Sequence, residues 1–507
     1  MRVGGTFFFI INRLQCTKQA CFLHHLRENP CYQVVHGDAK YTKRNDRSFS
    51  IFFACFLTLN TFPIMTLQLQ TTFKNHALRS VCLASALCCA SLAQAQGATS
   101  SLTLYGLVDV GVTSVSGLKN GNVTQVASGI KEGSRWGLKG NEDLGGGYRA
   151  IFTLENRFEA DTGAVSSRPI TGSQLSDRFS NAALLGLPPD VLLGLPAGTV
   201  QGTVNLIDAA LANEFGVNVG ATGGRLFDRQ AYIGLITPFG AFLAGRQYTP
   251  GYETFATYDI TNTQFGLSAG HIVAFPTVFE IRTPNSVAYR IVKNGISGAL
   301  MYAPGETAGG NSKGRLLGVN GNYKTGNFSV GLGYNTKNNE LGQKSLTSTV
   351  LGASVDLGAD KVSVMVVDIN DDHPNGLSVI SGLIAPAGSP APVVAFGSLV
   401  QSKFINAFIQ DGMLYHIGYK HTSGVHTTSV AYSTYNDKRP SDADVASYGV
   451  AYSYALSKRT DISAAVVHVD NKDRGQVAVG GNGYLGGVTK SAGTNSNSFA
   501  LGISHRF

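Results

Sequence analysis

The sequence predicts an all-β protein, a sixteen-stranded antiparallel transmembrane β-barrel, and three observations lead to this prediction. Apolar and polar residues alternate over many short segments, which is the period of a strand. After residue 96, no apolar run approaches the roughly 20 residues that a membrane-spanning helix needs. Very short turns and long connections follow each other in alternation along the chain, as they do in membrane barrels.

The alternation is clearest at the two ends of the predicted barrel. In the first segment, Thr103, Asp109 and Thr113 lie on one face, and the opposite face holds Leu104, Gly106, Val108, Val110 and Val112. In the last segment small or polar residues alternate with Phe499, Leu501, Ile503, His505 and Phe507. A soluble β-sandwich would show the same period, so alternation alone does not identify a membrane barrel.

The connections between strands decide between these folds. Seven tight turns are expected, at residues 141–147, 237–240, 293–295, 325–327, 358–360, 422–424 and 457–459. Eight longer connections fall between them, including those near residues 160–224, 248–283, 371–411 and 471–495. Fifteen connections make sixteen strands, with short turns on the periplasmic rim and long loops outside. A closed sheet is also required, because lipid offers no partner for unpaired backbone groups.

The first 95 residues differ in composition from the rest of the chain. All seven cysteines lie there, together with ten of the 40 Lys and Arg and three of the 32 Asp and Glu. Residues 96–507 therefore carry 30 basic and 29 acidic side chains. This near balance argues against an extended basic surface for nucleic acid. The lack of cysteine excludes disulfides and thiolate metal sites from the predicted barrel.

Residues 65–95 have the pattern of a secretory signal peptide. Lys74 and Arg79 precede an apolar run that ends in Ala-Gln-Ala at residues 93–95, so we expect cleavage before Gln96. The barrel would then comprise residues 96–507. Residues 1–64 lie upstream of this complete signal, and we expect them to be an untranslated or spurious extension. The alternative, an anchor at residues 51–64, is about 14 residues long and too short to span a bilayer.

Four segments carry a resemblance to a known family. They are SLTLYGLVD at 101–109, SRWGLKGNEDLGGG at 134–147, DRQAYIGL at 228–235 leading to GRQYTP at 245–250, and ISHRF at 503–507. In this order and at these spacings they resemble the trimeric general porins of Gram-negative outer membranes, especially the betaproteobacterial branch. The resemblance covers the chain after Gln96 from end to end.

This resemblance implies passive transport of ions and small hydrophilic solutes through a water-filled pore, without a cofactor. It also implies a homotrimer in contact with outer-membrane lipid and lipopolysaccharide. The terminal Phe507 is similar to the signal read by the outer-membrane insertion machinery. An adhesion or receptor barrel that works through its long second and sixth loops is the alternative.

The family pattern further implies a third loop, beginning at Tyr248, that folds into the barrel and faces a ladder of arginines. The expected constriction residues are Asp109, Arg135, Lys139, Arg229, Arg246, Glu253, Asp259 and Arg282. Strand alternation independently supports Arg135 but is ambiguous for Arg229 and Arg246. Simple pairing with a carboxylate such as Glu155 or Asp109 stays open for every arginine except Arg135. Because residues 260–279 contain no acid, we expect a weak anion bias.

Three other patterns in the sequence bear on function. His416, His421 and His426 are five residues apart, so neighbours fall on opposite faces of a strand and cannot share a zinc ion. His468 and Asp470 share a face, but no Gly-x-Ser-x-Gly accompanies them, and we expect no enzyme activity. Residues 204–217 have approximate helical spacing, which predicts a short helix in the second loop. By analogy with the family this loop would reach a neighbouring subunit, and the alternative is a loop packed on its own barrel.

Overall fold

The computed structural model describes residues 100–167, 174–214, 219–220, 225–273, 280–482 and 486–507. The predicted signal peptide and the extension before it lie outside these residues. The sixteen barrel strands are β1 (Ser101–Val115), β3 (Arg135–Gly145), β4 (Tyr148–Arg157), β7 (Gln230–Thr237), β8 (Gly240–Tyr248), β9 (Arg282–Lys293), β10 (Ile296–Ala303), β11 (Leu316–Thr325), β12 (Phe328–Asn338), β13 (Lys344–Leu357), β14 (Asp360–Asp371), β15 (Gln410–Ser423), β16 (His426–Asp437), β17 (Val445–Ala455), β18 (Thr460–Asn471) and β21 (Ser496–Arg506).

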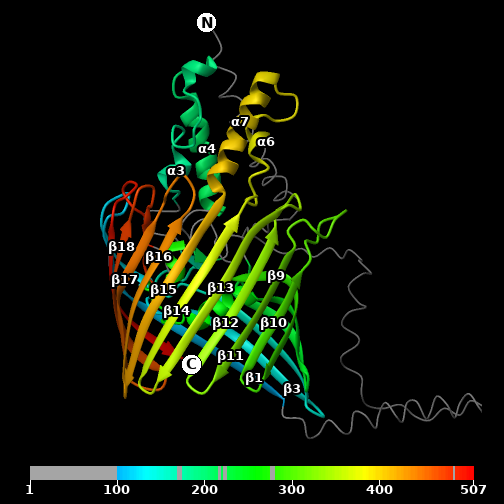
Figure 1. Cartoon of the computed structure of the whole chain (residues 1–507), viewed down its shortest axis with the longest axis vertical. Helices are drawn as coiled ribbons and strands as arrows, with labels where there is room; N and C mark the ends of the chain where they lie inside the picture. Colours follow the sequence, from blue (N-terminus) through cyan, green and yellow to red (C-terminus); the bar gives the residue numbers. More distant parts are fainter. Residues whose placement is uncertain (1–99, 168–173, 215–218, 221–224, 274–279, 483–485) are drawn as a thin grey trace, which may run out of the picture. The chain divides into compact units, whose positions relative to one another are not determined.

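The strands close into a barrel because the last one pairs with the first (Figure 1). Every strand is antiparallel to its neighbours, and β1 pairs with both β3 and β21. The terminal Phe507 exchanges two backbone hydrogen bonds of 3.1 Å with Gly106. A short strand, β2 (Val123–Ser128), continues the pairing along the outer half of β1. The predicted sixteen-stranded antiparallel barrel is confirmed.

The connections follow the predicted alternation. Tight turns join β3–β4, β7–β8, β9–β10, β11–β12, β13–β14, β15–β16 and β17–β18. We number the eight longer connections L1 (116–134), L2 (158–229), L3 (249–281), L4 (304–315), L5 (339–343), L6 (372–409), L7 (438–444) and L8 (472–495). Two-residue ladders lie within L2, between β5 (Ser166–Ser167) and β6 (Val219–Gly220), and within L8, between β19 (Val477–Ala478) and β20 (Gly487–Val488).

The outward face of the barrel is apolar. Leu104 on β1, Ile233 on β7 and Leu300 on β10 are at least 60% exposed, which is the pattern of a surface that lipid covers. Aromatic side chains such as Tyr415 and Tyr432 share this face. Within the described ranges, no helix is long and apolar enough to cross a membrane.

L2 and L6 form a helical arch at the external end of the barrel (Figure 1). L2 carries α3 (Asp177–Ser180), η2 (Asp190–Leu193) and α4 (Thr199–Glu214), and L6 carries α6 (Ile380–Ile384) and α7 (Ala391–Phe408). One buried cluster joins the two loops, and in it the rings of Phe179 and Phe408 lie 4.5 Å apart. L2 follows the third barrel strand and L6 the eleventh, so the loops leave from opposite points of a sixteen-strand ring. They therefore meet above the mouth.

The helix predicted in the second loop is present as α4, and it begins five residues before the predicted start. Residues 215–217 of the prediction lie outside the described residues. The inner face of α4, including Val204 and Ile207, is buried against the L6 helices rather than against the barrel wall. Asp190 fixes the start of the helix, since its carboxylate accepts from the N–H groups of Gly198 and Val200 at 2.8 and 2.7 Å.

Candidate functional site

L3 folds into the barrel and lies along its inner wall. Its helix α5 (Pro250–Tyr258) begins with Pro250 in the first turn, and the hydroxyl of Thr249 caps it by accepting from the N–H of Tyr252 at 3.4 Å. α5 contacts β10 to β14, and the following turn η3 (Ala269–Val273) contacts β15 to β17. The expected inward-folded third loop is confirmed, with its helix starting two residues after Tyr248.

The wall beneath L3 has glycine at the positions where L3 occupies the space that a side chain would need. A Cβ atom at Gly352 would lie 2.3 Å from the ring of Tyr258, and one at Gly418 would lie 2.1 Å from Ile260. Real Cβ contacts essentially never fall below 3.0 Å. Any larger residue at either position would push L3 away from the wall.

Hydrogen bonds from the wall hold L3 in this place. Asn335 on β12 accepts from the N–H of Gly251 at 3.0 Å and donates to the Thr249 hydroxyl at 2.9 Å. On β15, Nε2 of His416 accepts from the N–H of Ile260 at 3.1 Å. These side chains are buried, so each lost partner would leave an unsatisfied polar group.

The tip of L3 crosses the lumen and meets L1 and L8. The N–H of Phe265 donates to the Lys131 carbonyl at 3.0 Å, and Gln264 donates to Glu132 at 2.7 Å. Asn482 of L8 donates to the carbonyl of Thr263. L3 thus bridges the barrel from the wall that it packs against to the opposite side, and it narrows the lumen.

The wall across from α5, built from β1 to β9, carries charged side chains, and three ion pairs are prominent among them. Arg135 on β3 pairs with Glu132 of L1, and Arg290 on β9 pairs with Glu253 of α5. The third pair joins Arg229, next to β7, to Glu155 on β4 at 2.7 Å. Arg229 precedes the strand, and its pairing with Glu155 is the alternative that the sequence left open.

Two of these acids belong to loops, and their surroundings shift their pKa values in opposite directions. Burial alone would raise the pKa of Glu132, but Arg135 and Arg506 outweigh it and hold the pKa below its usual range. Burial raises the pKa of Glu253, and Arg290 offsets this only in part.

Three further cations on this wall have no carboxylate oxygen within 4.0 Å among the described residues. Lys139 lies over the ring of Tyr105, with its Nζ 4.3 Å from the centroid. Arg282 lies over the ring of Tyr248, 4.5 Å from its centroid, and also donates to its hydroxyl at 2.9 Å. Arg246 donates to the backbone carbonyl of Asp228 at 2.5 Å. Their positive charges are therefore not neutralised locally.

Two expected constriction acids are enclosed instead of facing water. Asp259 is 1% exposed, and its oxygens accept from Thr261, Ser268 and Ala269, so that it closes the turn after α5. Asp109 is fully buried and accepts from the N–H groups of L1, at 2.7 Å from Ile130. Both carboxylates hold loops in the lumen.

Sequence reasoning missed Glu132 and Arg290. Arg290 alternates on one face with Ser286 and Ala288, opposite Tyr289 and Ile291, so the period-2 test could have found it. Glu132 lies in a loop, where side chains do not alternate with the two-residue period of a strand.

The histidines weighed above have other partners. His421 contacts Asp360 at 2.6 Å, and His426 contacts the hydroxyl of Tyr452 at 2.7 Å. His468 packs on Tyr448 and contacts Asn497 rather than Asp470. In the part of the chain that the structure describes, no group of three or more His, Cys, Asp or Glu could hold a metal ion.

A closed sixteen-strand barrel, narrowed by an inward loop with charges on both sides, defines a porin-type channel. The family model for Gram-negative porins matches residues 80–474, and the chain belongs to this family. It is 25% identical over 443 residues to an outer membrane porin of Bordetella pertussis, covering 80% of this chain and 98% of that one. It is also 25% identical over 424 residues to outer membrane porin protein 32 of Delftia acidovorans, covering 81% and 95%.

Among solved structures, the fold is similar to the anion-selective porin from Comamonas acidovorans, with a TM-score of 0.56 and 22% identity over 80% of this chain and all of that one. The expected resemblance to Gram-negative porins of the betaproteobacterial branch is confirmed. The protein is a multi-pass outer-membrane porin through which small hydrophilic solutes diffuse passively, and it is not an enzyme.

Proposed function

We propose that the channel is an open general diffusion pore with a weak preference for anions. One observation carries this proposal. Each of the acids Glu132, Glu155 and Glu253 has an arginine partner, whereas Lys139, Arg246 and Arg282 have no acidic partner among the described residues. In a narrow lumen with low-dielectric walls, a few uncompensated charges set the local potential. The net charge of residues 96–507 is only about +1, so the preference has to arise locally.

The reversal potential of single channels in a planar bilayer tests this proposal. Under a potassium chloride gradient, we expect an open channel whose zero-current potential lies modestly on the chloride side. A strong preference for potassium would contradict the proposed role of the three cations. A barrel that inserts but does not conduct would instead favour the adhesion or receptor alternative.

We propose a division of roles among the eight expected constriction residues. Arg135, Lys139, Arg229, Arg246, Glu253 and Arg282 set the field in the lumen. Asp109 and Asp259, which are enclosed, position L1 and L3. Replacing Asp259 with Asn should therefore alter the conductance through a shifted loop more than it alters the reversal potential.

We propose that three copies assemble, with L2 reaching a neighbouring subunit. The resemblance to trimeric porins supports this, and so does the outward face of α4, where Leu206 is 66% exposed. Deletion of residues 163–220 should lower the melting temperature of the trimer on unheated gels. Because that deletion also uncovers the apolar L6 helices, the milder Leu206→Ser variant is the cleaner test. An unchanged melting temperature of the trimer in both variants would exclude this contact between L2 and a neighbouring subunit.

We propose that residues 65–95 are removed during secretion and that residues 1–64 are not translated. The start of β1 at Ser101, five residues after the expected new N-terminus at Gln96, supports this. Mass spectrometry of the outer-membrane protein should find Gln96 as its first residue. We also propose that the insertion machinery reads the last strand and that lipopolysaccharide surrounds the external half. A Phe507→Ser variant should then assemble poorly.

A further inference from the structure

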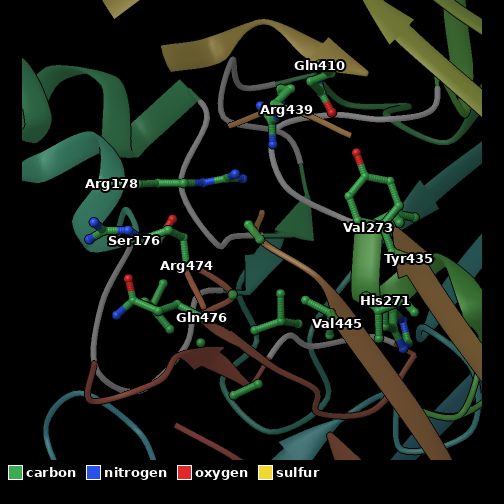
Figure 2. A pocket seen from close by; sticks show the side chains of 17 residues that line it. Ser176, Arg178, His271, Val273, Gln410, Tyr435, Arg439, Val445, Arg474 and Gln476 are labelled. Carbon is green, nitrogen blue, oxygen red and sulfur yellow. The ribbon is translucent and has the colours of Figure 1, made fainter. Parts of the chain in front are cut away.

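A cavity of about 60 Å³ lies on the external side of the constriction, where L2, L3, L7 and L8 meet (Figure 2). L2 contributes Ser176 and Arg178, and η3 of L3 contributes His271 to Val273. The strands and loops opposite contribute Tyr435 and Arg439. None of the ion pairs of the constriction belongs to this cavity, so it is a separate feature of the channel entrance.

Two guanidinium groups in this cavity share one carboxylate. Figure 2 shows Arg178 and Arg439 both extending into the space. Arg439 binds Asp437 through two contacts of 2.5 and 2.8 Å. The same carboxylate also accepts from Ser441 at 2.7 Å and from the N–H of Ala443 at 3.0 Å. Asp437 therefore has little capacity left for a second cation.

Arg178 is poorly compensated. Within the described residues its one hydrogen bond is a 3.5 Å contact to Asp437, and its guanidinium lies 4.5 Å from the centroid of the Phe179 ring, although its side chain is only 14% exposed. Burial and the nearby Arg439 lower the pKa of Arg178 to about 9, which reflects the cost of holding this charge here. A buried cation is stabilised by several acceptors, so this guanidinium is well placed to bind an anion in the cavity.

Other polar groups in the cavity also lack partners. Nδ1 of His271 is buried without a hydrogen-bond partner. Burial lowers the pKa of this histidine, and a hydrogen bond to the backbone of Gly266 opposes this only in part. Arg474 of L8 also lines the cavity, and no ion pair involves it among the described residues.

The rest of the cavity is apolar. Its lining includes Ile272, Val273, Val445, Val477 and Val488. An inorganic anion would make no favourable contact with these apolar side chains. The volume of about 60 Å³ is several times the roughly 10–15 Å³ that one water needs, which suits a short organic molecule.

We propose that this cavity is a binding site for a short-chain monocarboxylate. The carboxylate accepts hydrogen bonds from Arg178 and Arg439, and the alkyl part packs against the valine side chains. Guanidinium groups suit this role because their planar donors match the two carboxylate oxygens. The site goes beyond general diffusion, since it retains one class of solute at the entrance whatever the selectivity of the constriction.

Titration calorimetry of the purified full-length porin in detergent tests the proposal, with sodium propionate as the probe at constant ionic strength. We expect saturable binding that weakens at least tenfold in Arg178→Met. Methionine keeps an apolar stem against Phe179 and leaves Asp437 with Arg439, so the variant should still fold. Arg315→Met, which removes an arginine from L4 outside the cavity, is the matched control and should bind as the wild type does.

A second variant keeps the test decisive if Arg178→Met folds poorly. Gln410 lines the cavity and is 3% exposed, and Gln410→Glu would supply an internal carboxylate of the same shape. It should abolish propionate binding. The proposal is overturned if the wild type shows no saturable binding or if these variants bind equally well. It is also overturned if phosphate binds and propionate does not, because the apolar half would then have no role.

Discussion

The two halves of the inner wall of the barrel carry different kinds of side chain. Under L3, β10 to β15 present small polar residues, buried aliphatic side chains such as Val350 and Val367, and glycines whose missing side chains leave space for Tyr258 and Ile260. Across the lumen, β1 to β9 present arginine, lysine and tyrosine. The first half holds the loop that narrows the pore, and the second half sets the electric field inside it. Packing and selectivity can therefore be changed separately.

The largest effect is expected from filling the glycine half. In Gly352→Val the new side chain would overlap the ring of Tyr258, so L3 must leave the wall. We expect a clearly larger single-channel conductance and about 1–3 kcal/mol of destabilisation, the usual cost of overpacking.

Gly321→Val is the matched control, because a Cβ atom at Gly321 meets nothing within 4 Å. Its conductance should equal that of the wild type. Equal conductance in Gly352→Val would mean that L3 does not depend on this wall for its position.

A loss of stability that leaves L3 in place is expected on the charged half. Arg229→Met leaves the carboxylate of Glu155, a residue only 5% exposed, without its arginine. Glu155 keeps the 2.9 Å hydrogen bond from the Tyr105 hydroxyl, and the loss of a hydrogen bond to a charged partner costs about 1.5–3 kcal/mol. Urea unfolding should show the loss, and the double variant Arg229→Met/Glu155→Gln should recover most of it. A double variant as unstable as the single one would mean that the pair itself is not the cause.

The reversal potential is expected to depend on pH through Glu253, the acid that L3 places beside the charged half of the wall. Because the pKa of Glu253 is raised, this carboxylate loses its charge at a higher pH than an ordinary glutamate, while Glu132, whose pKa is lowered, keeps its charge. Lowering the pH from 7 to about 5 should therefore shift the reversal potential further toward anions. Glu253→Gln should show a smaller shift, and an identical pH response in this variant would refute the assignment.

The smallest effect is expected from Arg135→Ser. Glu132 keeps Arg506 as a partner at 2.5 Å, so the variant loses one positive charge without leaving an isolated acid. The reversal potential should move slightly toward cations, and heat-modifiable migration on gels should be unchanged. A reversal potential that does not move would remove Arg135 from the set of residues that act on the ions.

The strands and turns could be predicted from the sequence because their signals are local. Alternation and turn residues located all seven tight turns, and helical spacing located α4. Charged partners that are distant in sequence could not be predicted, since Glu253 reaches Arg290 only after L3 folds inward and Glu132 reaches Arg506 only after the barrel closes. The contact between L2 and L6 depends on loops that leave opposite points of the ring, so no local pattern predicts it.

The most direct test compares two double variants in the reversal-potential experiment. Lys139→Gln/Arg282→Gln removes two cations that have no acidic partner among the described residues. Arg135→Ser/Glu132→Ser removes one positive and one negative charge, and Arg506, the second partner of Glu132, keeps Asp461 at 3.1 Å. If the uncompensated cations set the selectivity, the first variant loses most of the anion preference and the second keeps it. The reverse outcome, or an equal change in both, would contradict the account.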